Sequence, residues 1–297
     1  MKKTIMIPDE VLLALSLKGG GGGGDSTFAF VSFTYVVGTV VTATKGTTTL
    51  TSDDSGYFVF ALPESGDWVF TDGVNSKTIS VNTYGIGIHT SFSLLKYSNV
   101  ENIIAEARLD NFDALSDKWG GFDVNTGLQQ KVDGDRDVVY APLSTYLKKE
   151  LGTAQNQVFT AYLVFKMTAD VSYGRIISSP YNDVENNDNC PCWLKVNNTA
   201  CYGRIGSEAS SGINPYSGYH VYALNLNGSG TLRACIDGLW VRTYSYTNGG
   251  NKVWMTYSTS RGEHSAGNIL FAGVVNTQES DQVVISNCNA LKEYFNL

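Results

Sequence analysis

The sequence predicts an all-β protein made of two β-sandwiches in series. Residues 27–95 are short strand-like runs separated by turn sequences roughly every ten residues, as in small sandwiches. A second stretch, residues 219–246, carries two turns, NGSG and DG, between alternating apolar runs. Seventeen tyrosines and only 16% charged residues complete the picture of a strand-rich chain with a polar surface.

Residues 1–18 are the predicted N-terminal anchor. Two lysines and an apolar run imitate a signal peptide, but Pro8, Asp9 and Glu10 interrupt the run, so we expect a retained, non-secretory segment. The same three residues can begin a short helix, which is marginal in water by itself. The segment is therefore expected to pack on its own chain or on another protein of an assembly.

Residues 19–26 are the predicted linker. Six consecutive glycines cannot pack a core and form a flexible tether spanning on the order of 13 Å. No strand precedes them and no Lys-Ser/Thr pair follows, which argues against a phosphate-binding loop.

Residues 27–96 are predicted to form a small seven-stranded sandwich. The expected strands are FAFVSFTY, TVVTATK, TTTLTS, YFVFAL, DWVFTD, KTISVN and HTSFSL. The order VTAT…TLTSDDSGYFVFALPESGDWVFTDG resembles the carboxypeptidase-regulatory-like or transthyretin-like Ig modules. That resemblance covers about 65 residues and implies a non-catalytic spacer or interaction domain.

Residues 97–297 form the second predicted domain. A connecting segment is expected to contain a short helix around residues 100–108. The run VFTAYLVFKM at 158–167 has a strongly apolar alternating face and is expected to be a central strand next to the 219–246 meander.

The Asp237-Gly238 pair predicts a two-residue type I′ hairpin turn. Its register would place Ala234 opposite Val241 and Arg233 opposite Arg242. The core face is then Leu232, Ala234, Ile236, Leu239 and Val241, and the other face is Arg233, Cys235, Trp240, Arg242 and Tyr244. Facing arginines need an acidic neighbour, an aromatic ring or a ligand, and stacking on Trp240 and Tyr244 is the simplest solution.

Three segments, YHVYALNLNGSGTLRACIDGLWV, NILFAGVV and DQVVISNCNALKEYFNL, resemble the laminin-G-like, concanavalin A-like jelly rolls. In that family a similar meander precedes a last strand and a short helix. The resemblance covers about residues 100–297, and its motifs specify a fold better than an activity.

Aromatic rings beside polar side chains make candidate glycan contacts. The candidates are Trp193, Tyr202, Tyr216, Arg233, Trp240, Arg242 and Tyr244. Many laminin-G-like domains bind calcium through oxygen donors, so the resemblance also suggests weak calcium ligands, although such loop residues are usually only solvated. These are Asp183, Glu185, Asp188 and Asp237.

The five cysteines stand at 190, 192, 201, 235 and 288, and their odd number leaves at least one unpaired in a monomer. Reduced thiols are the simplest interpretation. A disulfide from Cys201 to Cys190 or Cys192 needs oxidising surroundings. A zinc site on the three clustered cysteines lacks an evident fourth ligand.

The sequence predicts no catalytic residue and no enzyme. Jelly-roll glycanases carry an E-x-D-x-(x)-E strand, and the nearest fragment, Glu279-Ser280-Asp281, lacks the third carboxylate. The three histidines, at 89, 220 and 264, are scattered.

The net charge of −7 argues against nucleic-acid binding and against attraction to an anionic membrane. No membrane insertion is expected.

An anchor, a tether, an Ig-like spacer and a lectin-like head together resemble surface proteins of phage particles, such as head or tail fibres and decoration proteins. The resemblance implies assembly in the host cytoplasm, contacts with other virion proteins through residues 1–24, possible homo-oligomers and host attachment through surface glycans. A secreted or cell-surface bacterial carbohydrate-binding or adhesion protein is the alternative, and a jelly-roll glycan hydrolase is a third.

Overall fold

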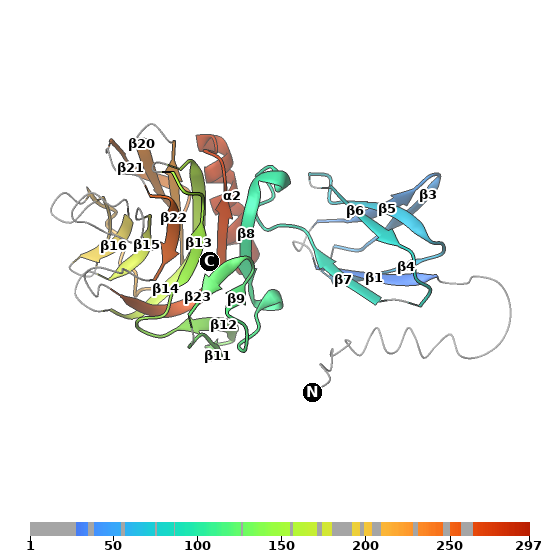
Figure 1. Cartoon of the computed structure of the whole chain (residues 1–297), viewed down its shortest axis with the longest axis horizontal. Coiled ribbons are helices and arrows are strands. Elements are labelled where there is room, and N and C mark those ends of the chain that lie inside the picture. Colours follow the sequence, from blue (N-terminus) through green and yellow to red (C-terminus); the bar gives the residue numbers. More distant parts are fainter. Residues whose placement is uncertain are drawn as a thin grey trace. The chain divides into compact units, whose positions relative to one another are not determined.

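A computed structural model of the chain (Figure 1) is all-β apart from one α-helix and two 3₁₀ turns in the residues it describes. It describes residues 28–34, 39–54, 57–74, 76–85, 87–125, 127–154, 157–170, 174–179, 192–196, 199–203, 209–227, 231–245, 250–256 and 264–297. The predicted fold class is confirmed. The anchor and the glycine tether lie outside the described residues.

The chain divides into two compact units, Met1–Phe92 and Ser93–Leu297. The sequence placed this junction after residue 96. The structure puts it earlier because Leu94 and Leu95 pack in a core cluster of the second unit.

The first unit contains all seven predicted strands. They form a three-stranded sheet, β4-β1-β7, and a four-stranded sheet, β3-β2-β5-β6. The strands are β1 Ala29–Thr34, β2 Thr42–Lys45, β3 Thr48–Thr51, β4 Tyr57–Leu62, β5 Gly66–Thr71, β6 Ser76–Val81 and β7 Gly87–Ser91.

Aromatic side chains fill the core of this unit. Alternate residues of β1 are fully buried, and the Phe33 ring lies 4.7 Å from the Phe70 ring and 5.1 Å from that of Phe92. Period-two alternation thus gives each strand one apolar face that closes the sandwich.

The second unit is a larger sandwich of two sheets. One has the order β18-β17-β16-β15-β22-β13-β10-β9, and the other has the order β11-β12-β23-β14-β19-β20-β21 with β8 paired to β23. The strands are β8 Ile103–Arg108, β9 Lys118–Trp119, β10 Phe122–Val124, β11 Gln129–Asp133, β12 Arg136–Ala141, β13 Leu147–Glu150, β14 Phe159–Asp170, β15 Arg175–Ser178, β16 Cys192–Val196, β17 Thr199–Gly203, β18 Ala209–Ser210, β19 His220–Leu226, β20 Thr231–Ile236, β21 Leu239–Ser245, β22 Lys252–Met255 and β23 Ser265–Val275.

The predicted central strand is confirmed as β14. It pairs with β23 on one side and with β19, the first strand of the meander, on the other. Leu163 and Phe165 face the core between the sheets, whereas Tyr162 and Val164 belong to a second apolar cluster. Both faces of β14 are therefore buried.

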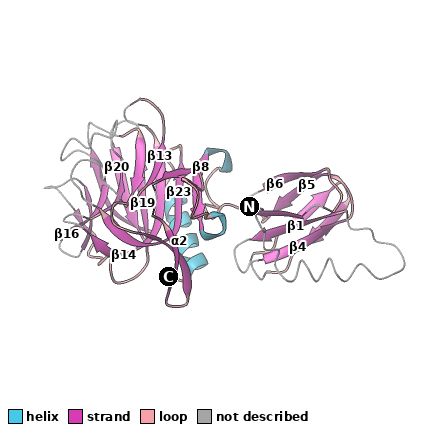
Figure 2. Cartoon of the chain, turned by 60° about the horizontal axis from the view of Figure 1, so that its bottom comes forward, coloured by secondary structure: helices cyan, strands magenta, loops and turns pink. Residues whose placement is uncertain are grey.

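The helix α2, Asp281–Phe295, provides the cover for that second cluster. Figure 2 shows it in cyan, and it packs against β19 and β20 of the second sheet. Its N-terminus is capped by the Ser280 side chain, and it ends at Asn296 in the left-handed conformation. The Arg136 guanidinium donates to the carbonyls of Phe295 and Asn296, which complete the C-terminal cap.

The helix predicted around residues 100–108 is wrong. A 3₁₀ turn, η1 Val100–Asn102, leads directly into β8. Ala105 and Ala107 are buried at alternate positions, and β8 adds to the sheet beside β23. Pairing with an available strand thus overrides the local helical pattern.

The hairpin turn is confirmed, since both Asp237 and Gly238 have positive φ angles of 53° and 84°. The register beyond it is wrong, because a bulge between Ala234 and Cys235 pairs Ala234 with Arg242. The two arginines do not face each other. Leu239, expected in the core, is 69% exposed at the turn.

Candidate functional site

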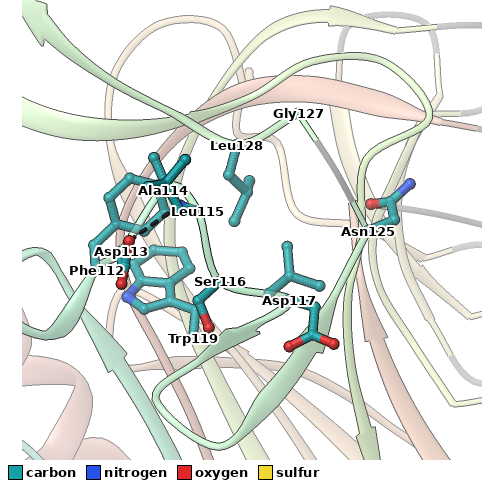
Figure 3. Close-up of a pocket in the computed structure, with 11 residues that line it drawn as sticks. Phe112, Asp113, Ala114, Leu115, Ser116, Asp117, Trp119, Asn125, Gly127 and Leu128 are labelled. Atoms are coloured by element: carbon teal, nitrogen blue, oxygen red, sulfur yellow. Dashed lines mark hydrogen bonds between the residues drawn. The ribbon is translucent and has the colours of Figure 1, made fainter. Parts of the chain in front are cut away.

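One pocket is hollowed into the second unit at the β9–β10 edge of its first sheet (Figure 3). It has a volume of about 150 Å³ and lies between two segments, residues 112–119 and 124–128. Its floor is apolar and its rim carries carboxylates, an amide and a hydroxyl. The lining residues are Phe112, Asp113, Ala114, Leu115, Ser116, Asp117, Trp119, Val124, Asn125, Gly127 and Leu128.

The floor is held rigidly by the strands behind it. The Trp119 indole donates a hydrogen bond of 2.8 Å to the Arg108 carbonyl, and the Phe112 ring meets its edge at 5.3 Å. The chain then turns at Gly120, where φ is +55° and a side chain would clash with the Glu106 carbonyl. The close approach to β8 thus requires glycine and sets the position of the tryptophan.

The rim is a short loop whose own side chains accept hydrogen bonds from its backbone amides. The Asp113 carboxylate accepts from the Leu115 amide at 3.0 Å, and the Ser116 hydroxyl accepts from the Lys118 amide at 3.1 Å. This local bonding leaves the Leu115 side chain 98% exposed, and Asp117, two residues later, is exposed as well.

Asn125 serves as a support on the opposite wall. Its amide oxygen accepts from the Tyr146 backbone at 2.7 Å, and its amide nitrogen donates to the Ser144 carbonyl at 2.8 Å. The pocket therefore has one fixed polar wall and one loop wall, and only the loop wall presents an exposed carboxylate.

Two of the predicted glycan contacts are structural aromatics. Trp193 is fully buried in the core between the sheets, where its indole donates to the Ala223 carbonyl at 2.9 Å and its ring packs on Tyr222. Tyr216 is partly buried against the same core. Composition identified aromatic rings but did not say which side of a strand they occupy.

Arg233 and Trp240 form a structural pair under α2. The guanidinium lies 4.2 Å from the centre of the Trp240 ring and makes an ion pair with Asp281 at the start of the helix. The predicted stacking is confirmed for Arg233 on Trp240, and an acidic neighbour, Asp281, is present as well. The side chains of Tyr202, Arg242 and Tyr244 lie outside the described residues, although β17 and β21 carry their backbones.

None of the four predicted contacts whose side chains the structure describes, Trp193, Tyr216, Arg233 and Trp240, lines the pocket. The pocket residues were missed, although DNFDALSDKWGG at 110–121 carried a signal. Acidic and small residues surround an isolated leucine a few positions before Trp119-Gly120-Gly121. This pattern indicates a polar surface loop that leads into a buried aromatic residue and a turn.

Asp237, the one calcium candidate within the described residues, has protein partners. It accepts from His220 Nδ1 at 2.8 Å and from the Val221 amide at 2.9 Å. Burial alone would raise the pKa of Asp237, but these hydrogen bonds outweigh it and hold the pKa below its usual value. Asp183, Glu185 and Asp188 lie outside the described residues, among which no group of three or more His, Cys, Asp or Glu side chains is arranged to hold a metal ion.

The same aspartate belongs to a group with the outline of a Ser-His-Asp triad. Ser217 Oγ lies 3.4 Å from His220 Nε2, and His220 in turn contacts Asp237. The Ser217 hydroxyl, however, donates to the Asn214 carbonyl at 2.7 Å within an exposed turn. A hydroxyl that donates to a backbone carbonyl is not activated by the histidine. The group is better explained as a set of hydrogen bonds that holds the turn in place.

The two acids of the glycanase-like fragment are engaged separately. Glu279 is buried and accepts from the Tyr162 hydroxyl, and burial raises its pKa above the usual value. Asp281 pairs with Arg233. Each therefore has a role in docking α2 to the sheet.

Cys192, Cys235 and Cys288 are buried thiols, and Cys192 Sγ accepts a hydrogen bond from Arg175. The structure does not describe Cys190 or the Cys201 side chain. Across the described part of the chain, no helix has the length and apolarity needed to cross a membrane.

No family model matches the chain, and no curated protein matches it. Among solved structures it is similar to domain 4 of an extracellular GH43 arabinanase, AbnA, from Geobacillus stearothermophilus, in complex with arabinotriose. That match has 11% identity and a TM-score of 0.47, over 63% of this chain and 98% of that one.

The binding domain of Paraclostridial Mosquitocidal Protein 1 matches at 10% identity and a TM-score of 0.45, over 67% of this chain and 53% of that one. The CBM40 of the Ruminococcus gnavus IT-sialidase bound to α2,3-sialyllactose matches at 15% identity and a TM-score of 0.35, over 44% of this chain and 82% of that one. Similarities this low carry no argument about what the present chain binds.

Proposed function

We propose that this chain is a non-enzymatic surface protein of a phage particle, whose second unit binds a host-surface glycan in the pocket between residues 112–119 and 124–128. Residues 1–24 would attach it to other virion proteins, and the first unit would act as the spacer. The observation that carries the binding proposal is the combination of an apolar floor with a polar rim in that pocket.

The chemistry of the pocket suits one sugar residue. A sugar ring has apolar C–H faces and a ring of hydroxyl donors, so it can pack against the apolar side chains accessible at the pocket mouth, Leu115 and part of Phe112, while donating to a rim carboxylate. Trp119 and Leu128 are almost fully buried and support the pocket from behind. A volume of about 150 Å³ is below the ~300–1,000 Å³ of drug-sized sites. We therefore propose recognition of a terminal monosaccharide unit rather than a long stretch of polymer.

The acidic rim also limits the ligand. Asp113 and Asp117 both border the pocket, so a neutral or amino sugar fits better than a sugar acid, whose carboxylate would be repelled. Because these two carboxylates belong to a loop with its own internal bonding, they are proposed to accept hydrogen bonds rather than to catalyse.

The test is a glycan array probed with the full chain, followed by calorimetric titration of the best ligand. Replacing Asp117 with Asn removes the exposed carboxylate, and we expect affinity to fall roughly 5- to 30-fold, as for loss of a charge-assisted hydrogen bond. Asp135→Asn removes another exposed carboxylate, in the β11–β12 turn, and is the matched control.

Equal effects of the two substitutions would contradict the proposed site. Failure of every array glycan to bind, at concentrations up to millimolar, would contradict the proposed function itself.

A further inference from the structure

Two cysteines meet where α2 docks on the sheet. Cys235 on β20 lies opposite Trp240, on the side of the hairpin that faces the helix. Cys288 lies on the buried face of α2 with Val284 and Leu291. Both thiols are fully buried in the same apolar cluster.

The two thiols lie within reach of each other in this cluster. The thiols of Cys235 and Cys288 share a hydrogen bond, and the Gly238 backbone amide donates to Cys288. The helix is pressed closely on the turn, because a methyl group added at Gly238 would lie 2.6 Å from the Asn289 amide oxygen.

The ends of the helix are fixed as well, which holds the two cysteines in register. Arg233 pairs with Asp281 in the first turn of the helix, and Arg136 bonds the carbonyls of Phe295 and Asn296 at its end. A disulfide needs the two Cβ atoms about 3.5–4.5 Å apart. The close packing of α2 on β20 and its turn brings Cys288 to the strand that carries Cys235.

We propose that Cys235 and Cys288 are a dithiol modification site, where a small-molecule disulfide produces an intrachain bond that fastens α2 to β20. This inference does not depend on glycan binding. Cys192 is buried on the other sheet and has Arg175 as its partner, so it is not part of the pair.

The reaction balances as two successive exchanges. The thiolate of one cysteine attacks a sulfur atom of the reagent disulfide and releases one small thiolate. The second cysteine then displaces the remaining half of the reagent and closes the protein disulfide. Both cysteine sulfurs are oxidised, the reagent disulfide is reduced to two thiols, and the two cysteine protons leave with those thiols.

The docked helix controls the rate of this reaction. The hydrogen bond with Cys235 and then burial raise the pKa of Cys288 well above its usual value, so little reactive thiolate exists while α2 is in place. Oxidation should therefore follow transient opening of α2 and accelerate as the temperature approaches the unfolding transition.

The experiment uses the reduced full chain incubated with oxidised glutathione at increasing temperature, alkylated with N-ethylmaleimide and mapped by mass spectrometry. We expect one peptide pair, joined through Cys235 and Cys288, with a mass lower by two hydrogen atoms. The apparent melting temperature of the second unit should rise by about 5–15 °C, and dithiothreitol should reverse the rise.

Cys192→Ser should keep both the cross-link and the thermal shift, whereas Cys288→Ser should lose both. If the Cys288→Ser variant fails to fold, the presence or absence of the cross-linked peptide in the wild-type protein still tests the proposal. If Cys235 and Cys288 become alkylated or glutathionylated singly while the cross-linked peptide is absent, the proposal is overturned. A thermal shift without the cross-linked peptide would also overturn it.

Discussion

At the scale of single residues, Asp237 shows how one side chain can be predicted in conformation and missed in role. Its pairing with Gly238 identified the turn because Asp tolerates a positive φ. Its carboxylate, however, binds His220 and the Val221 amide across the meander, and no local pattern encodes those partners. Trp193 is a similar case, since aromatic content alone did not distinguish a buried ring from a ligand platform.

Asp237→Asn should destabilise the second unit by about 1–2 kcal/mol at pH 7, because the substitution removes a charged hydrogen-bond acceptor. Asparagine also adopts positive φ angles, so the turn itself should be kept. The pKa of Asp237 is lowered in the folded state, so its stabilising contribution is present above the unfolded-state pKa of about 3.9 and is lost as pH falls through the folded value. The melting temperatures of the two proteins should therefore begin to converge as pH falls below about 4 and should meet below the folded-state pKa of Asp237.

The raised pKa values of Glu106 and Glu279 act in the opposite direction but are common to both proteins, so they cancel in the comparison. A difference that stays constant from pH 7 to acid would show that the carboxylate charge is not the cause.

At the scale of elements, strands were predictable and their partners were less so. The alternation of β14 identified a central strand, and turn residues marked all seven strands of the first unit. The β8 segment was misassigned because its local pattern also suits a helix, and only the edge beside β23 decides the outcome. The bulge between Ala234 and Cys235 shifts the register of the hairpin, and the length of the turn does not encode it.

Docking of α2 on the hairpin predicts unequal effects of two glycine substitutions. Gly238 and Gly134 both have left-handed φ angles, +84° and +69°, but only a methyl at Gly238 meets a neighbour, Asn289. Gly134→Ala should cost about 1 kcal/mol from backbone strain, and Gly238→Ala should cost about 1–3 kcal/mol more from overpacking. Urea unfolding measures both, and equal costs would mean that the helix does not press on the turn.

At the scale of the whole molecule, the two-unit organisation and the fold class followed from the sequence, but the pocket did not. The two segments that line the pocket flank the β9–β10 hairpin, which turns at Gly120 against β8, and no local sequence pattern encodes that approach. The virion assignment rests on resemblance of domain order and stays a proposal.

Deletion of residues 1–24 tests that assignment. We expect the shortened chain to keep its folded core, because the buried clusters of the described residues close each sandwich with side chains from residue 29 onward. It should nevertheless be lost from purified particles, which quantitative mass spectrometry of virions would measure. Undiminished incorporation of the shortened chain would exclude residues 1–24 as the attachment segment.

The binding pocket is the centre of this account, and a crystal structure of the full chain soaked with its best array glycan tests it most directly. We expect electron density for one terminal sugar between residues 112–119 and 124–128, within hydrogen-bonding distance of Asp117. Clear density for the sugar on another surface of the second unit, with this pocket unoccupied, would contradict it.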